Sequence, residues 1–274
     1  MARDSCKMTQ PRVILWSVPR SLSTAFERSV MELKNVKTIH EAHNNAYFFG
    51  PERMTESQIN HPDDIQPNAT FEEAKQQLLS EYDGYDAVFA KNQAYFIEGR
   101  YEEYIEGSFS RFKHTFLMRH PLKAVPSRYN ICKQCNLRFN ASECGFRQLY
   151  ELYNIVKRVD PNPLLLDADD LLSNPREMME HYCFVTGLPF QEHMLSWKPG
   201  VVHEGWTSFR HSDVWFKDVA NSAGFIKPKL TGAVVADYSN LEAEAREVVE
   251  YSLPYYDALY PLRMKPTLPL TPKQ

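Results

Sequence analysis

The chain reads Arg12-Val-Ile-Leu-Trp16 and continues directly into Ser17-Val-Pro-Arg-Ser-Leu-Ser-Thr24. The first run is short and apolar, as buried strands are, and the amphipathic stretch at 25–33 predicts a helix. Backbone N–H groups at a helix start bind anions, and the guanidinium of Arg20 adds further donors. The segment therefore predicts a strand, a phosphate-binding turn and a helix, although neither G-x-x-x-x-G-K-[ST] nor G-x-G-x-x-G occurs.

Four more short apolar runs follow, separated by helical patterns. Runs without strict alternation are typical of a parallel sheet that is covered on both faces. The predicted strands are Arg12–Trp16, Val36–Ile39, Ala87–Ala90, Thr115–Met118 and Leu164–Leu166. The predicted helices include Phe71–Tyr82, Phe146–Val159, Glu177–Thr186 and Leu241–Tyr260, the last interrupted by Pro254. The alternation predicts an α/β fold, doubly wound, with a central parallel sheet of about five strands and helices on both faces.

Neither a linker nor an internal repeat divides the chain. We expect a single domain over residues 1–274, with its core at about 12–190. A helical or lid-forming region is expected at about 191–260 and an irregular tail at 261–274. The polar segment Gly50–Asn68 contains three prolines and is expected to form a surface loop or lid.

The composition limits the classes of protein to consider. Of 274 residues, 43% are hydrophobic and 24% are charged, which is ordinary for a globular domain. The net charge of −4 does not support a nucleic-acid partner or an anionic membrane surface. No apolar run approaches the roughly 20 residues of a membrane span, and five cysteines, an odd number, are typical of reduced thiols. We expect a cytoplasmic protein that binds neither nucleic acid nor a membrane.

Polar side chains follow every predicted strand. In open parallel sheets, ligands bind beyond the carboxyl ends of the strands. In chain order, the strand ends carry Arg20, Ser21, Ser23 and Thr24; His40, Glu41 and His43; Lys91 and Asn92; Arg119 and His120; and Asp167, Asp169 and Asp170. Together these residues predict an anion-binding cleft with an acid and a base nearby, while Asp169 and Asp170 are expected to hold neighbouring elements.

The fourth strand end predicts a second anion site. Pro121 suits the first position of a helix, and Arg119 precedes Ser127 by eight residues. A guanidinium at the strand end and a hydroxyl two helical turns on can address the same anion. Two such sites on one sheet predict a ligand with two phosphate-like groups.

Three segments resemble the P-loop sulfotransferase family. They are Val18–Phe26, Phe116–Tyr129 and Leu164–Glu177, in the family's order, and the resemblance covers about residues 12–190. The chain is most similar to the bacterial-type branch, which has a His-Glu pair after the second strand and a lysine after the third.

The resemblance implies a donor, 3′-phosphoadenosine-5′-phosphosulfate (PAPS), with adenosine 3′,5′-bisphosphate as product. Arg20 falls on the position that contacts the 5′-phosphate, and Arg119 with Ser127 falls on the 3′-phosphate positions. The donor-binding residues implied are Arg20, Ser21, Leu22, Ser23, Thr24, Arg119, Ser127 and, as a loose substitute for a missing C-terminal basic motif, Lys217. Leu22 replaces a glycine of the cytosolic branch, which makes close approach of the backbone to phosphate less assured.

The resemblance also implies transfer to a hydroxyl or amine of a small-molecule acceptor, without a metal. Cationic side chains and amides can stabilise the leaving oxygen by themselves. The cytosolic branch has a histidine base after the third strand, but this chain reads Lys91-Asn-Gln-Ala-Tyr95 there. The base is therefore Glu41 or His43, with Lys91 and Arg20 as the charges near the transferred group. His40, Glu41 and His43 do not form the H-E-x-x-H pattern of a metal site.

Two other functions are compatible with the same sheet. A nucleotide-binding module with weak or no transfer would fit the missing histidine and Leu22. A small-molecule kinase is disfavoured by the absence of G-K-[ST].

Two further patterns have structural explanations. Cys132, Cys135 and Cys144 lack a fourth ligand at zinc spacing, so we expect packed thiols. Tryptophans recur at 197, 206 and 215, and we expect core positions with one or two lining an acceptor pocket.

Overall fold

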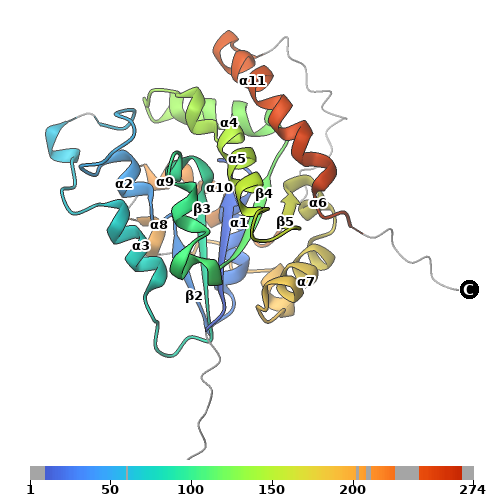
Figure 1. Cartoon of the computed structure of the whole chain (residues 1–274). Helices are drawn as coiled ribbons and strands as arrows, with labels where there is room; N and C mark the ends of the chain where they lie inside the picture. Colours follow the sequence, from blue (N-terminus) through green and yellow to red (C-terminus); the bar gives the residue numbers. More distant parts are fainter. Residues whose placement is uncertain (1–9, 60, 202–203, 208–210, 226–240, 267–274) are drawn as a thin grey trace, which may run out of the picture.

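A parallel sheet organises the computed structural model, which describes residues 10–59, 61–201, 204–207, 211–225 and 241–266 (Figure 1). The strands are β1 (Arg12–Ser17), β2 (Val36–His40), β3 (Ala87–Gln93), β4 (Lys113–Met118) and β5 (Leu164–Asp167), in the order β2-β3-β1-β4-β5. All pairs are parallel. The predicted fold class and all five predicted strands are confirmed.

The register places the strand ends at one level. Ser17, the last residue of β1, pairs with Gln93 on one side and Leu117 on the other. His40 at the end of β2 pairs with Lys91. The loops that follow β2, β3, β1 and β4 therefore emerge at the same edge of the sheet, in that order.

Helices cover both faces of the sheet. The α-helices are α1 (Ser23–Met31), α2 (Asn44–Phe48), α3 (Phe71–Leu79), α4 (Pro121–Gln134), α5 (Phe146–Val156), α6 (Ala168–Ser173), α7 (Pro175–Thr186), α8 (Glu204–Thr207), α9 (Ser212–Trp215), α10 (Lys217–Asn221) and α11 (Ala243–Leu259). Short 3₁₀ helices are η1 (Pro62–Asp64), η2 (Ala94–Ile97), η3 (Tyr101–Tyr104), η4 (Gly107–Arg111), η5 (Ala141–Cys144), η6 (Glu192–Leu195) and η8 (Tyr260–Leu262).

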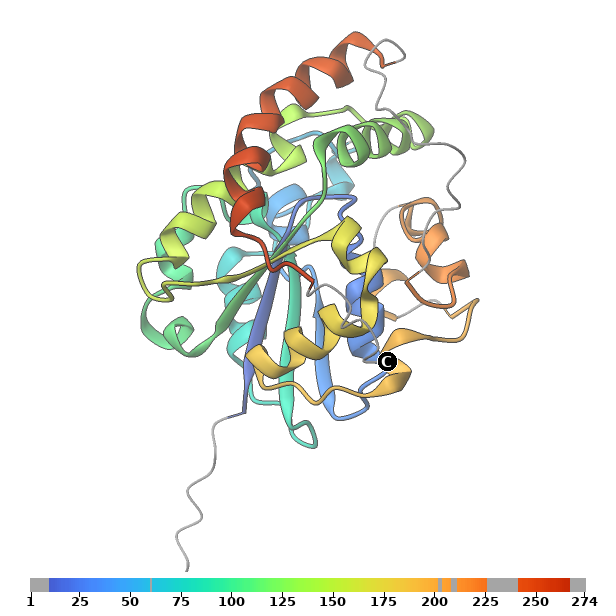
Figure 2. The same ribbon diagram turned by 90° about the vertical axis from the view of Figure 1, so that its right-hand side faces the viewer.

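Two apolar clusters form the core, one on each face. Phe26 and Val30 of α1 pack with Met178 and Tyr182 of α7 against one face of the sheet. The other face is covered by residues of α3, α5 and α11, together with the aromatic residues of α2 and η2. Figure 2 shows α5 and α11 on one side of the sheet and α1 and α7 on the other.

The ends of three predicted helices differ slightly from the structure. α3 ends at Leu79 instead of Tyr82, and the hydroxyl oxygen of Thr70 caps its start by accepting the N–H of Glu73 at 3.0 Å. α5 ends at Val156, three residues before the predicted end. α7 begins at Pro175, because proline at the first helical position costs no hydrogen bond.

The predicted interruption of the last helix at Pro254 was wrong, because α11 runs through this residue. Proline removes one backbone N–H from the helix, which is destabilising. Val249, Tyr256 and Leu259 on both sides of Pro254 are buried against the core, and this packing holds the helix together.

The two predicted irregular segments can be followed in part. The described residues of Gly50–Asn68 form a mostly exposed loop, in which the Ser57 hydroxyl donates to Glu143 at 2.7 Å. The start of the tail is held by a hydrogen bond of 2.8 Å from the Met264 N–H to the Leu165 carbonyl. Residues 267–274 of the tail, like 226–240 of the expected lid region, lie outside the described residues.

Replacing either of two glycines by alanine gives a matched test of packing, because both have a positive φ and only one has a close neighbour. Gly145 precedes α5 with φ 76°, and a Cβ there would lie 3.3 Å from Cδ1 of Tyr95. Gly187 has φ 75°, but a Cβ there would meet nothing within 4 Å. We expect Gly145→Ala to lower the free energy of unfolding by about 2–3 kcal/mol and Gly187→Ala by about 1–2 kcal/mol, because only the first adds crowding to left-handed strain. Urea unfolding measures both, and equal losses would contradict the crowding at Tyr95.

Candidate functional site

The turn after β1 has an unusual backbone. Arg20 and Leu22 have φ of 64° and 69°, in the left-handed region that costs non-glycine residues energy. The buried hydroxyl of Ser21 holds the turn by donating to the Val18 carbonyl at 2.7 Å. Leu22 precedes the first residue of α1, and its carbonyl accepts the Phe26 N–H at 2.9 Å. Leu22 thus keeps the conformation that glycine would favour, and strain of this kind is concentrated at functional sites.

A pocket of about 460 Å³ lies at the carboxyl edge of the sheet. Residues that follow β1, β2, β3 and β4 all contribute to its wall, as the register requires. Of the predicted residues, Arg20, Leu22, Ser23, Thr24, Glu41, Lys91, Arg119 and Ser127 line it. The structure therefore brings most of the predicted site together.

Two arginines form the cationic end of this pocket. Nη1 of Arg119 donates to the Arg20 carbonyl at 3.2 Å, and Nε of Arg20 donates to the Ser127 hydroxyl at 3.0 Å. Burial lowers the pKa of both guanidinium groups, and Arg119 lowers that of Arg20 further. Nε of Arg119 is buried without a hydrogen-bond partner in the described part of the chain. Two desolvated cations and an unsatisfied donor indicate a site for an anion.

Glu41 and Lys91 form another part of the pocket wall. Glu41 has φ 43°, and its carboxylate forms an ion pair with the ammonium of Lys91 and accepts from Nε2 of Gln93 at 2.7 Å. Burial pushes the pKa of Glu41 up, but the charges of Lys91 and His40 outweigh it, and the pKa lies below its ordinary value. The site thus holds an ionised carboxylate at neutral pH.

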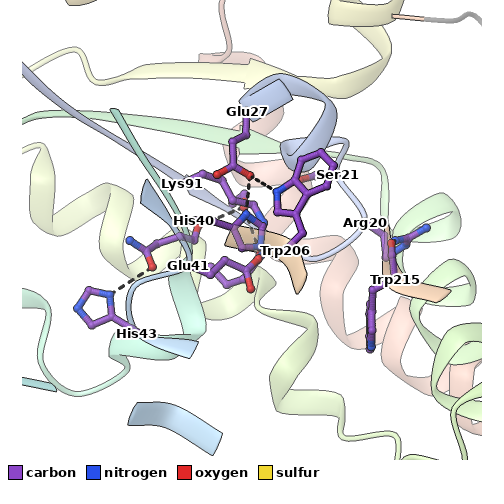
Figure 3. A network of polar contacts seen from close by, with 12 residues as sticks. Arg20, Ser21, Glu27, His40, Glu41, His43, Lys91, Trp206 and Trp215 are labelled. Carbon is purple, nitrogen blue, oxygen red and sulfur yellow. Dashed lines mark hydrogen bonds and ion pairs between the residues drawn. The ribbon is translucent and has the colours of Figure 1, made fainter. Parts of the chain in front are cut away.

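His43 lies outside the pocket. Its side chain is fully buried, with Nδ1 3.3 Å from Oδ1 of Asn92 and Nε2 2.6 Å from the Tyr104 hydroxyl. Burial lowers the pKa of His43 to about 4, so the imidazole is neutral. Figure 3 shows His43 on the opposite side of Glu41 from Arg20. Of the two candidate bases, only Glu41 lines the pocket that Arg20 and Arg119 also line.

Two other predicted donor-binding residues also lie off the main pocket. Ser21 serves the turn itself, as described above. Lys217 is exposed at the start of α10 and lines an adjacent hollow that shares Arg20 and Ser127 with the main pocket.

The C-terminal region contributes a wall of the pocket, where the sequence indicated one or two of the tryptophans but not Asp218 or Phe225. Trp215, Asp218 and Phe225 line the pocket, and Asp218 lies 3.7 Å from the guanidinium of Arg20. The carbonyl of Trp215 accepts from Nη1 of Arg20 at 3.3 Å. Trp215 is the tryptophan of the predicted three that lines the pocket, whereas Trp206 is fully buried.

A buried carboxylate anchors this wall. Glu27 of α1 is fully buried, and its Oε2 lies 2.5 Å from Nδ1 of His40 and 3.4 Å from Nε1 of Trp206 (Figure 3). The ring of Phe216 packs on both His40 and Trp206, with centroids 5.3 Å apart in each case. Glu27 thereby ties α8 to the end of β2.

Arg128 is a pocket residue that the sequence analysis missed. It pairs with the buried Glu143 at 2.5 Å and lies 5.9 Å from the ring centroids of Tyr95 and Trp215. Its position directly after Ser127 in the fourth strand's motif was the available signal. Asn44, Phe48 and Tyr95 also line the pocket and carried no signal.

The cysteines and aspartates have the structural roles expected. Cys132, Cys135 and Cys144 are buried free thiols. Asp169 pairs with Lys123 at 2.6 Å, and Asp170 pairs with Arg263 at 2.7 Å. Within the described ranges, no three His, Cys, Asp or Glu side chains are grouped to hold a metal ion. No helix in the same ranges has both the length and the apolar character to cross a membrane.

The chain belongs to the sulfotransferase domain family, whose sequence pattern matches residues 11–261. The family indicates a transferase. A solved structure, the sulfotransferase domain from the Synechococcus PCC 7002 olefin synthase, is similar with a TM-score of 0.47 and 15% identity, covering 88% of this chain and 94% of that one.

Two curated proteins of Arabidopsis thaliana are also similar. Branched-chain-amino-acid aminotransferase-like protein 1 is 26% identical over 92% of this chain, and protein 2 of the same name is 25% identical over 78%. The aligned regions cover 42% and 36% of those proteins, so the chain spans less than half of their length.

The ion pair between Glu41 and Lys91 predicts that the pKa of Glu41 changes when the charge of Lys91 is removed. In Lys91→Met, burial is opposed only by His40 and Gln93, so we expect the pKa of Glu41 to rise and the carboxylate to be lost at higher pH than in the parent protein. A carbon-detected NMR titration of the glutamate side chains measures this. Lys123→Met, whose ammonium pairs with Asp169, should leave the titration of Glu41 unchanged. An unshifted Glu41 in Lys91→Met would contradict the assigned electrostatics.

Proposed function

We propose that the protein is a sulfotransferase that moves a sulfuryl group from PAPS to a hydroxyl or amine of a small-molecule acceptor. One observation carries the proposal: a pair of desolvated arginines and an ionised carboxylate line the same pocket at the carboxyl edge of the sheet. The first group suits a phosphate-bearing donor, and the second suits proton removal from an acceptor. Membership of the sulfotransferase domain family supports a sulfuryl group as the group transferred.

The residues at the cationic end fit such a donor. Arg119 has a buried Nε with no partner among the described residues, and a phosphate oxygen would satisfy it. Arg20 and the N-terminus of α1 would hold the 5′ end, with Ser23 and Thr24 in the first turn. Arg119 and Ser127 would hold the 3′-phosphate, with Lys217 in the adjacent hollow. When bound, the donor supplies an activated sulfuryl group and a stable bisphosphate leaving group.

Arg20 would then act on the leaving group and Glu41 on the acceptor. Arg20 would stabilise negative charge on the leaving phosphate oxygen as its bond to sulfur breaks. Glu41 accepts the proton from the acceptor as the new bond to sulfur forms, and Lys91 and Gln93 hold the carboxylate in position. No step in this scheme requires a metal ion.

The donor assignment predicts a binding preference. Adenosine 3′,5′-bisphosphate should raise the Tm more than AMP does, because ligands that bind the native state stabilise it, and EDTA should not abolish the shift. Arg119→Ala should weaken bisphosphate binding by about 1.5–3 kcal/mol, the range of a charge-assisted hydrogen bond.

A matched control is Lys123→Ala, which removes an exposed cation of α4 that does not line the pocket. Titration calorimetry should give the parent affinity for this variant. Equal shifts from AMP and the bisphosphate would remove the case for a 3′-phosphate site.

The assignment of Glu41 as the base predicts the effect of replacing its carboxylate with an amide. Glu41→Gln keeps the shape of the side chain and removes its basicity, so turnover of labelled PAPS should fall by on the order of 10²-fold or more. Donor binding should be nearly unchanged. His43→Asn, within the core, should do less.

The two variants together decide between the candidate bases. A larger loss in His43→Asn than in Glu41→Gln would transfer the role to His43. Bisphosphate binding without turnover on any hydroxyl or amine would instead favour a nucleotide-binding module.

A further inference from the structure

Arg128 adds a third guanidinium to the pocket wall, beside those of Arg20 and Arg119. It lies two helical turns into α4, directly after Ser127, and is 4% exposed. The hydroxyl of Ser127 accepts from Nε of Arg20 at 3.0 Å, so α4 and the turn after β1 meet at this point. The donor contacts and the base of the proposed function leave Arg128 without a role.

A buried carboxylate holds Arg128 in place. Oε2 of Glu143 accepts from Nη2 of Arg128 at 2.5 Å, and both side chains are at most 5% exposed. Oε1 of Glu143 accepts from the Ser57 hydroxyl at 2.7 Å and from Nδ2 of Asn140 at 3.1 Å. Both oxygens of Glu143 are therefore engaged, and the carboxylate is fixed in its direction toward Arg128. A donor whose position is set in this way is preorganised, as stabilisation of a transition state requires.

Two aromatic rings flank the guanidinium of Arg128. The ring centroids of Tyr95 and Trp215 each lie 5.9 Å from its Cζ, within the range of a cation–π contact. The carbonyl of Trp215 also accepts from Nη1 of Arg20 at 3.3 Å, and Figure 3 shows the Trp215 side chain beside Arg20. Arg20 and Arg128 are thus neighbours of the same residue. Besides burial, the charge of Arg128 lowers the pKa of Arg20, which agrees with this proximity.

Tyr95 links Arg128 to the proposed base. Burial raises the pKa of Tyr95, and the charges of Arg128 and Glu41 act on it in opposite directions. Tyr95 lies two residues after Gln93, whose Nε2 donates to Glu41 at 2.7 Å. Arg128 therefore has Arg20 as one neighbour and, across Tyr95, Glu41 as the next. In the proposed reaction, the transferred group moves between the leaving oxygen at Arg20 and the acceptor at Glu41.

The guanidinium of Arg128 has N–H groups available for a ligand. It carries five such donors, and the hydrogen bond to Glu143 occupies one of them. Its Nε is buried without a hydrogen-bond partner in the part of the chain that the structure describes. Buried donors of this kind are rare, and an oxygen ligand is one explanation for them.

The pairing with Glu143 indicates the kind of oxygen that suits Arg128. A terminal phosphate carries a charge of about −1.5 to −2 at pH 7, whereas a sulfuryl group carries less. Directed N–H groups on a cation that already has a counter-charge suit the less charged group. They can follow its oxygens through the transfer without binding the ground state more tightly than the transition state.

We propose that Arg128 is a further catalytic residue, which donates hydrogen bonds to the sulfuryl oxygens during transfer, and that Glu143 positions it. The proposal rests on the sulfotransferase function and adds two residues to it. The bond from sulfur to the leaving phosphate oxygen breaks as the bond from sulfur to the acceptor forms, and the acceptor proton passes to Glu41. Arg128 keeps its protons throughout.

The test compares two ligands that differ only in the sulfuryl group, PAPS and adenosine 3′,5′-bisphosphate. The variant is Arg128→Gln combined with Glu143→Gln, because removing one partner of a buried ion pair would leave the other charge unpaired. Titration calorimetry without an acceptor should show the affinity for PAPS falling by about tenfold, as expected for the loss of a charge-assisted hydrogen bond. The affinity for the bisphosphate should stay at the parent value, whereas a merely structural role would weaken both ligands alike.

The matched control is Arg147→Gln combined with Glu98→Gln. Arg147 and Glu98 also form an ion pair, but neither residue lines the pocket. This variant should keep the parent affinities for both ligands.

A second variant protects the test against a failure to fold. Arg128→Lys keeps a cation beside Glu143 but lacks the Nε donor and the planar fork, so the affinity for PAPS should again fall relative to that for the bisphosphate. With an acceptor that the parent protein sulfates, kcat of the double glutamine variant should fall by on the order of 10²-fold, as on removal of a transition-state donor.

Each other outcome identifies a different error. An unchanged ratio of the two affinities would overturn the assignment, and equal weakening of both ligands would place Arg128 at the 5′-phosphate instead. A loss confined to acceptors that carry a carboxylate, with PAPS binding intact, would move Arg128 to the acceptor and also overturn it. Failure of the parent protein to bind the bisphosphate would reject the sulfotransferase function itself, whereas this inference can fail while that binding is intact.

Discussion

The level register of β1 with β3 and β4 is the constraint on which the site depends. Ser17 pairs with Gln93 and Leu117, so three central strands end together. The strand ends are buried, and the polar side chains that follow them must share one confined space. Proximity of the guanidinium of Arg20 to those of Arg119 and Arg128 follows from this arrangement and not from any local preference of those residues.

Two kinds of group at the strand ends are energetically unfavourable: residues with a left-handed backbone conformation and desolvated cations. Arg20, Leu22 and Glu41 have left-handed backbone conformations, which non-glycine residues adopt at a cost of about 1–2 kcal/mol each. Arg20 and Arg119 are desolvated, and the carboxylates near them, including the exposed Asp218 at 3.7 Å from Arg20, do not fully offset the effect of burial on their pKa values. Strain and desolvated charge at a pocket are the features expected of a binding site, because packing elsewhere must compensate for both. The two apolar clusters on either face of the sheet supply that packing.

The charges around the pocket are balanced only in part. Glu41 is bound to Lys91 and Arg128 is bound to Glu143, so each of these four groups has a counter-charge. Nε of Arg119 and Nε of Arg128 are nevertheless buried without a hydrogen-bond partner among the described residues. Both unsatisfied donors belong to arginines whose charges act on Arg20, which is a feature expected of an anion site. The C-terminal segment completes the pocket, because Glu27 ties Trp206 to the sheet and Trp215 and Asp218 reach Arg20.

The sequence by itself determined the strands, the turn after Arg12–Trp16 and the residues that follow each strand. These features depend on short-range properties: apolar runs, a proline at a helix start and polar residues at strand ends. The tertiary structure alone decided which of those residues meet. His43 is two residues from Glu41, yet a turn at the end of β2 directs it to Asn92 and Tyr104 and leaves only Glu41 in the pocket. Arg128, Trp215 and Asp218 join the site through contacts across 87 to 198 residues of chain, and Pro254 is tolerated because α11 is buried. Charge pairing and packing between distant segments have no signature in a local pattern, so only the folded chain could show them.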